Sequence, residues 1–164
     1  MSLTLLEQSW RDEPAPQLIS HLLTRYHARH REQLPELVRL ARRVEQVHGT
    51  HAHCPDGLAD LLTDMQQELE SHMCKEEHVL FPLLQQGFGA RAAPPIQVML
   101  FEHDQHAQAL DKLLALTHGC TPPVDACHTW RTLYDGLQAF HDDLVQHIHL
   151  ENNVLFANAL NPAR

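Results

Sequence analysis

The sequence lacks the features that mark membrane-spanning, secreted and nucleic-acid-binding proteins. None of its 164 residues lies in a run of 18 apolar residues, so no membrane span is expected. The N-terminus has no basic segment followed by an apolar one, which indicates a cytoplasmic location rather than secretion. The four cysteines form no CxxC pair and favour reduced thiols over a disulfide framework. A net charge of −9 argues against a nucleic-acid partner.

Histidine, by contrast, is abundant, with 15 copies. It is the commonest metal ligand among side chains, but exposed histidines need no metal, so their placement must decide. Hydrophobic residues make up 43% of the chain, enough for a packed core, and the length fits one domain. We place this domain at residues 16–164, after an N-terminal segment of residues 1–15.

Glycine and proline divide the chain into four long segments, none of which shows the sustained two-residue alternation of a strand. The expected helices are 16–48, 58–86, 95–117 and 123–160. The expected loops are 51–57, 87–94 and 118–122. Pro35 is expected to kink the first helix. This pattern predicts an all-α fold, an up-down four-helix bundle.

In the second and fourth segments, apolar residues recur at alternating steps of four and three, which is typical of the inward seam of a bundled helix. The second stripe comprises Leu58, Leu62, Met65, Leu69, His72, Glu76, Val79 and Leu83. The fourth comprises Trp130, Leu133, Leu137, Phe140, Leu144, His147, Glu151 and Val154. Each stripe is apolar except for one histidine and, four residues later, one glutamate.

These two HxxxE motifs belong to an internal repeat. The segment 72–81 resembles 147–156, at an offset of 75 residues, and the segment 27–34 resembles 103–110, at an offset of 76. The simplest interpretation is two helical hairpins related by a pseudo-twofold axis. Each hairpin then contributes one separate histidine and one HxxxE motif.

Residues four apart project from the same side of a helix, so each HxxxE pair points inward together. A buried carboxylate without a partner is costly, and neither stripe carries an arginine or lysine to neutralise it. Divalent cations would resolve this conflict. A single HxxxE motif is more often a surface pair, and a single inward histidine is more often a core residue. Two matched pairs and two matched histidines reverse that judgement.

The expected metal ligands are His27, His72, Glu76, His103, His147 and Glu151. This set exceeds what one tetrahedral zinc ion uses, and calcium or magnesium sites need no histidine. Mixed imidazole and carboxylate ligation in a bundle favours a dinuclear iron or manganese centre. A symmetric assignment gives each ion two histidines, with both glutamates and one oxo or hydroxo group bridging. Each ion then keeps an open position for a small ligand.

This motif arrangement resembles the hemerythrin-like domain, and longer strings resemble the di-iron repair-of-iron-centres family (YtfE/ScdA type). The resemblance runs from about Pro16 to the C-terminus. The matching strings include Arg25-Tyr26-His27, Ser71-His72-Met73, Leu80-Phe81-Pro82, Glu102-His103-Asp104 and Leu150-Glu151-Asn152-Asn153-Val154-Leu155-Phe156.

The resemblance implies a non-haem, oxo-bridged centre of two iron ions and a role in repairing iron–sulfur clusters damaged by nitrosative or oxidative stress. Nitric oxide binding, its enzymatic reduction to nitrous oxide, and iron donation are the activities that it suggests. The implied partners are NO or O2 and damaged iron–sulfur proteins, with the chain a monomer or homodimer. The resemblance also associates Glu68 and Glu102 with a polar path to the metals, although an exposed surface role suits Glu68 equally well.

Other interpretations stay open. Residues 1–15 contain no cysteine, so the chain is expected to lack the small cysteine-pair domain with which the family usually begins. A hemerythrin-like O2 or NO sensor or carrier is the alternative function, although Ala107 stands where oxygen carriers have a fifth histidine. A ferritin-like oxidase needs two Glu-x-x-His motifs, and we find one inward candidate, Glu45–His48. A metal-free bundle is the remaining alternative. His30 and His106 are expected in the core or behind the ligands.

Overall fold

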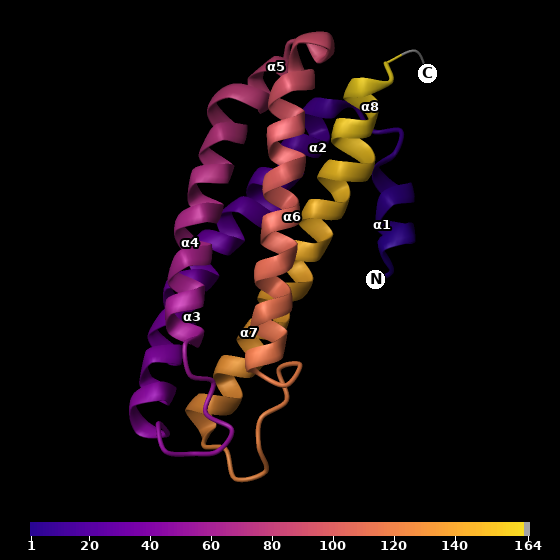
Figure 1. Cartoon of the computed structure of the whole chain (residues 1–164). Helices are drawn as coiled ribbons and strands as arrows, with labels where there is room; N and C mark the ends of the chain where they lie inside the picture. Colours follow the sequence, from indigo (N-terminus) through magenta and orange to yellow (C-terminus); the bar gives the residue numbers. More distant parts are fainter. Residues whose placement is uncertain (163–164) are drawn as a thin grey trace.

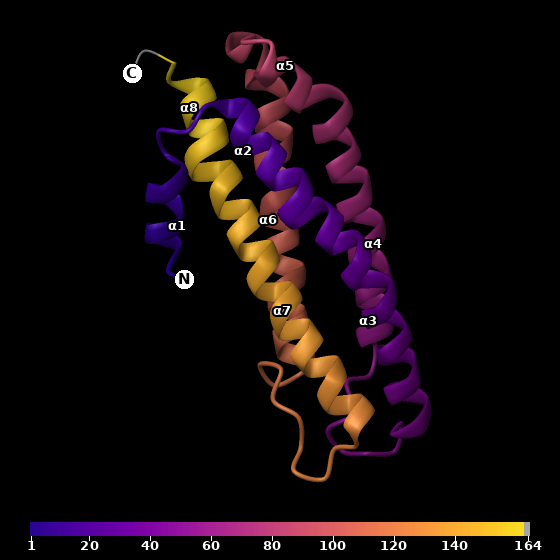
Figure 2. The same cartoon turned by 180° about the vertical axis from the view of Figure 1, so that it is seen from behind.

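The computed structural model describes residues 1–162, and these form helices and loops without strands. Four long helices run side by side, each antiparallel to the next along the chain (Figure 1). The two long loops, 48–57 and 117–127, lie at one end of the bundle, and the end of the last helix lies at the other (Figures 1 and 2). The N-terminus lies beside the bundle, about midway along it. The expected all-α, up-down four-helix bundle is confirmed.

Each long helix is assembled from shorter segments, and a further short helix precedes the bundle. The first long helix comprises α2 (Ala15–His21), the π-helical turn η1 (Leu22–His27) and α3 (Ala28–Val47). The second comprises α4 (Leu58–Lys75), the π-helical turn η2 (Glu76–Leu80) and α5 (Phe81–Gln85). The third comprises the 3-10 turn η3 (Gly89–Ala92) and α6 (Ala93–Leu116). The fourth comprises α7 (His128–Leu150), the π-helical turn η4 (Glu151–Leu155) and α8 (Phe156–Leu160).

The start of the fourth helix was wrongly predicted at residue 123, because α7 begins at His128. The loop before it is held in a non-helical conformation by Arg131, whose guanidinium donates to the backbone carbonyls of Pro123, Val124 and Ala126. The third helix also differs, since η3 lies inside the expected loop 87–94 and α6 begins at Ala93.

The N-terminal segment contains a helix that the sequence analysis did not predict, α1 (Leu3–Trp10). The Ser2 hydroxyl caps it by accepting a hydrogen bond from the backbone N–H of Leu5 at 3.2 Å. Leu6 is buried against the bundle, and His149 of α7 pairs with Glu7 at 3.1 Å. In Figure 2, α1 lies outside the bundle beside the last helix.

Two apolar clusters fill the bundle. The loop-end core lies toward the two long loops and includes Leu62, Trp130, Leu133, Leu137 and Phe140. The terminal core lies toward the other end of the bundle, near α2, α5 and α8, and includes Leu18, Ile19, Phe81, Ile96 and Phe156. Within residues 1–162, no helix combines the length and the apolarity needed to cross a bilayer.

The three π-helical turns all lie at one level of the bundle, where the inward histidines and glutamates are. A π-helical turn adds one residue to a helical turn, so it shifts every later side chain around the helix. After Glu76, the inward positions of the second helix are therefore Leu80 and Leu84. The sequence analysis wrongly placed Val79 and Leu83 inward; Val79 is 53% exposed and Leu83 only half-buried.

Candidate metal centre

The six predicted ligands converge in the middle of the bundle, between the two cores. None of their side chains is more than 1% exposed. His27 closes η1, and His103 comes from the middle of α6. His72 and His147 lie in the last turns of α4 and α7, just before the glutamates that open η2 and η4. Each long helix thus contributes one histidine.

Glu151 and Glu76 lie between the histidines. The Oε2 atom of Glu151 is 3.1 Å from Nε2 of His147, and its Oε1 atom is 3.0 Å from Nε2 of His103. The Oε1 atom of Glu76 lies 3.2 Å from Nε2 of His27 and 3.4 Å from Nε2 of His72. Each carboxylate therefore contacts the two histidines of its own hairpin, and Oε2 of Glu151 also lies 3.9 Å from Nε2 of His27 in the other hairpin.

The ligand atoms form two groups in which all atoms lie within 4.8 Å of one another. One group is His27, His147, Glu76 and Glu151, and the other is His72, His103, Glu76 and Glu151. We call these position A and position B. Both glutamates belong to both groups, as a pair of bridging carboxylates requires. The symmetric assignment predicted from the sequence is therefore geometrically possible.

The outer nitrogen of each imidazole has its own hydrogen-bond partner. Nδ1 of His27 donates to Glu77 at 2.7 Å, and Nδ1 of His72 donates to Glu102 at 2.9 Å. An ionised carboxylate can only accept, so Nδ1 carries a proton in both rings and Nε2 is the atom that faces the centre and would bind a metal.

The other two imidazoles are oriented by neutral groups. Nδ1 of His103 donates to Oδ1 of Asn152 at 2.6 Å, and Nδ1 of His147 pairs with Nε2 of His30 at 3.0 Å. Hydrogen bonds of this kind fix the ring orientation of metal-binding histidines.

The pseudo-twofold relation predicted from the repeat is visible in the contacts. The pair His27–Glu77 corresponds to the pair His103–Asn152 at the repeat offsets. His27 stacks on Phe81 at 5.6 Å between ring centroids, and His103 stacks on Phe156 at 5.9 Å. The two hairpins therefore build the same local environment from different carboxylate and amide groups.

The unpaired atoms of this cluster fit a dinuclear metal centre. All four oxygens of Glu76 and Glu151 are buried without a hydrogen-bond partner, as is Nε2 of His27 and of His147. Nε2 of His72 and of His103 face each other at 3.1 Å. Buried carboxylates and facing lone pairs are costly without positive charge, and cations between them would satisfy these groups together. The buried histidine and glutamate cluster is compatible with a di-iron centre.

The pKa shifts of these residues without bound cations also indicate that the cluster needs positive charge. Burial lowers the pKa of His72 to about 2, so this imidazole is neutral, the form that binds a metal. Burial and the charge of Glu151 raise the pKa of Glu76 well above its ordinary value. Burial opposes protonation of His27 as well, but Glu151 and Glu76 outweigh it and raise its pKa to about 10. Protons thus take part of the role that cations would have.

The two acids associated with a polar path lie on one side of the cluster. Glu68 is exposed, Glu102 is half-buried, and both line a cavity of about 290 Å³ beside α4 and α6. His106 also lines this cavity, and Glu102 contacts the predicted ligand His72 directly. A path through this cavity stays a prediction.

Several residues around the ligands were missed by sequence reasoning. Arg31 contacts both Glu70 and Glu77 at 2.9 Å, and Lys75 contacts Glu102 at 2.6 Å. These pairs are contributed by different helices, so no short motif marks them. Asn152 could have been found, because it stands in the repeat where Glu77 stands.

Comparison with known proteins places the chain in a family. The model of the hemerythrin HHE cation-binding domain matches residues 18–159. This chain belongs to the hemerythrin HHE family. Its HHE domain thus covers almost the whole bundle, and the resemblance inferred from the motifs is confirmed. Residues 1–15, which include α1, lie outside the match.

Individual members of the family are closely similar. The chain is 52% identical over 153 residues to the iron–sulfur cluster repair protein YtfE of Pectobacterium carotovorum subsp. carotovorum; this stretch is 93% of the chain and 69% of that protein. It is 53% identical, with the same coverage, to the protein of that name from Yersinia pestis strain Pestoides F. The HHE domain of this chain therefore resembles part of a longer repair protein.

Proposed function

We propose that this chain is a non-haem di-iron protein that repairs iron–sulfur clusters damaged by nitrosative or oxidative stress. The observation that carries the proposal is the buried cluster of four imidazoles and two unpaired carboxylates, held between two apolar cores. The high identity to proteins named for cluster repair supports the biological role.

The ligands that we propose are the six predicted residues. His27 and His147 would hold one iron ion and His72 and His103 the other, with Glu76 and Glu151 shared between them. Two bound iron ions would supply adjacent open positions for small ligands such as NO or O2, together with redox chemistry. The protein keeps the four ring lone pairs directed inward through the hydrogen bonds at their Nδ1 atoms.

The surrounding residues would control access and charge. Phe81 and Phe156 cover the side of the cluster that faces the terminal core, which keeps bulk water away. Glu68 and Glu102 line the cavity on another side and would guide cations or protons toward the ligands. At the cavity wall, Glu102 lies between Lys75 at 2.6 Å and the proposed ligand His72 at 2.9 Å.

The finer form of the proposal is reduction of two molecules of nitric oxide to nitrous oxide and water, with two electrons and two protons. The alternatives are iron donation to damaged clusters, and reversible O2 or NO binding as a sensor or carrier. Ala107 is exposed and offers no donor atom, so it gives the carrier alternative no further ligand. Damaged iron–sulfur proteins in the cytoplasm would be the partners, with the chain a monomer or homodimer. The four unpaired cysteines suit a reducing compartment.

The test combines two assays on the iron-loaded protein. Repair predicts that adding it, with a reductant, to a nitric-oxide-damaged iron–sulfur enzyme restores that enzyme's activity, whereas protein with Glu76→Ala does not. Anaerobic reaction of the reduced protein with nitric oxide should release nitrous oxide. Restored activity without nitrous oxide would favour iron donation. A reversible, spectrally visible gas adduct with neither activity would favour the sensor or carrier.

A further inference from the structure

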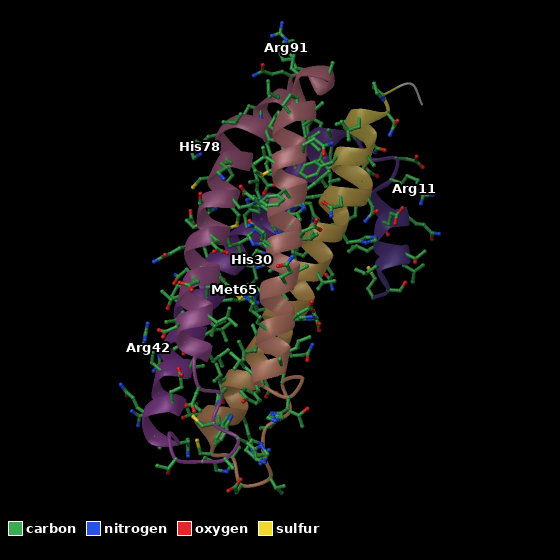
Figure 3. The ribbon with its side chains drawn as sticks, in the orientation of Figure 1. Arg11, His30, Arg42, Met65, His78 and Arg91 are labelled. Carbon is green, nitrogen blue, oxygen red and sulfur yellow. The ribbon has the colours of Figure 1, made fainter. Side chains whose placement is uncertain are left out.

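One of the four oriented imidazoles is held differently from the others. His147 pairs through Nδ1 with Nε2 of a second buried histidine, His30, at 3.0 Å, and the two rings are 24° from parallel. His30 is fully buried. Figure 3 shows it in the middle of the bundle, whereas Arg42 and Arg91 point outward. If His147 donates from Nδ1, His30 must accept at Nε2 and carry its own proton on Nδ1.

Gln33, one turn along α3, offers an acceptor oxygen for the proton of His30. Nδ1 of His30 and Oε1 of Gln33 are both buried without a hydrogen-bond partner. Burial lowers the pKa of His30 to about 2, and the side chain of Gln33 opposes this as a hydrogen-bond partner. The amide of Gln33 is itself fixed, because its Nε2 donates to Oδ2 of Asp143 at 2.9 Å. Its Oε1 is therefore left for His30.

The line of polar groups continues to the surface. Asp143 of α7 is only 8% exposed, and its Oδ1 accepts from the guanidinium of Arg25 at 2.9 Å. Arg25 and Asp143 line a surface hollow of about 410 Å³. His30, Gln33, Asp143 and Arg25 thus connect a proposed ligand with the protein surface, on a side that neither Glu68 nor Glu102 reaches.

The repeat supplies a natural comparison. His106 stands in the second hairpin where His30 stands in the first, and it is also buried. Its ring meets His72 edge-on at 4.9 Å, and its Nε2 has no partner. His72 donates instead to Glu102, so His106 holds no ligand by a hydrogen bond.

We infer that His30 is a positioning residue for position A, holding His147 with its Nε2 lone pair inward, while Gln33 and Asp143 hold His30 in turn. His106, despite its matching place, does not serve position B in this way. The inference rests on the proposed ligand set. Groups that orient metal-binding histidines typically change metal affinity about 10–100-fold when they are removed.

The experiment titrates metal-free protein with Fe²⁺ under anaerobic conditions and compares His30→Leu with His106→Leu. His30→Leu should weaken one of the two ions about 10–100-fold and leave the other unchanged. His106→Leu should bind both ions as the original protein does. Gln33→Leu should weaken the same ion as His30→Leu, by a smaller factor.

A comparison of the two ions separates positioning from a general structural role. Leucine leaves Nδ1 of His147 without its partner, so the metal-free His30→Leu protein should unfold at a lower urea concentration whichever role His30 has. The two roles differ in selectivity: a merely structural histidine would weaken both ions alike, whereas a positioning histidine weakens one. His30→Gln, which keeps an acceptor toward His147, should recover part of the lost affinity and also serves if His30→Leu does not fold.

Wild-type binding of both ions by His30→Leu would overturn the inference, as would equal losses in His30→Leu and His106→Leu. His147→Ala distinguishes this failure from a wrong ligand set. If His147→Ala also keeps both ions, the ligand assignment itself is wrong. If His147→Ala loses an ion and His30→Leu does not, only the positioning role is wrong.

Discussion

The loop-end core and the ligand layer occupy neighbouring levels of the same four helices but follow opposite rules. The loop-end core is built on regular α-helix and apolar side chains such as Trp130 and Leu137, which are completely buried. The ligand layer contains three π-helical turns and two buried carboxylates without hydrogen-bond partners. The first stabilises the fold whether or not metal is bound, and the second costs stability until cations arrive.

The largest effect is expected in the ligand layer. Glu151→Ala removes the carboxylate that contacts both His103 and His147, so iron content should fall well below two ions per chain. Glu76→Ala should do the same. Elemental analysis of protein expressed with ample iron measures this, with Glu36→Ala, an exposed acid on α3, as the control. Full iron content in both site variants would refute the shared-carboxylate assignment.

In the loop-end core, the opposite pattern is expected. Trp130→Ala empties a fully buried site and should cost about 3–5 kcal/mol of unfolding free energy. The folded fraction should still bind iron in full, because Trp130 contacts no proposed ligand. Urea denaturation of the metal-free protein gives the free energy, and Val124→Ala, at a 98% exposed site, is the control. Loss of iron from folded Trp130→Ala would mean that the two levels are not independent.

A third variant, Glu76→Gln, should stabilise the metal-free protein and yet weaken its binding of iron. The pKa of Glu76 is raised by burial and by Glu151, so its contribution to stability is present at low pH and lost as pH rises through its raised pKa. Glutamine does not titrate. Metal-free Glu76→Gln should therefore be more stable at neutral pH, by roughly 1–4 kcal/mol, and the difference should shrink on acidification. The variant should also bind less iron. Denaturation curves at several pH values measure this, and a pH-independent difference would contradict it.

The smallest effect is expected in the loop 117–127, at the end of the bundle away from the terminal core. His118→Ala lies in an exposed turn with a positive φ of 52° and should leave iron content unchanged. The unfolding free energy should change by no more than about 1 kcal/mol. A clear loss of iron in this variant would show that histidines outside the ligand layer contribute to loading.

The same contrast explains what the sequence could and could not predict. Regular α-helix has a fixed period, so the inward stripe of the fourth segment was predicted correctly from Trp130 to His147, and Glu151 and Val154 beyond it are also buried as predicted. All six proposed ligands also lie where the two matched HxxxE motifs and the two matched histidines indicated. A π-helical turn has no comparable signature, and the inward register after Glu76 was therefore wrong at Val79 and Leu83.

The residues that hydrogen-bond to the proposed ligands were harder to predict, because these contacts depend on how neighbouring helices pack against each other. Glu77 contacts His27 across two helices, and Asn152 contacts His103 in the same way. Periodicity places each of these residues on its own helix but does not pair them. The roles of His30 and His106 likewise differ only in the folded structure. There Glu102, and not His106, forms the hydrogen bond with Nδ1 of His72.

Metal analysis of the purified protein, combined with Mössbauer spectroscopy, tests the central claim most directly. The account predicts two iron ions per chain, with spectra of non-haem iron in nitrogen and oxygen coordination. Protein that is grown with abundant iron, folds normally and yet contains no iron would contradict it.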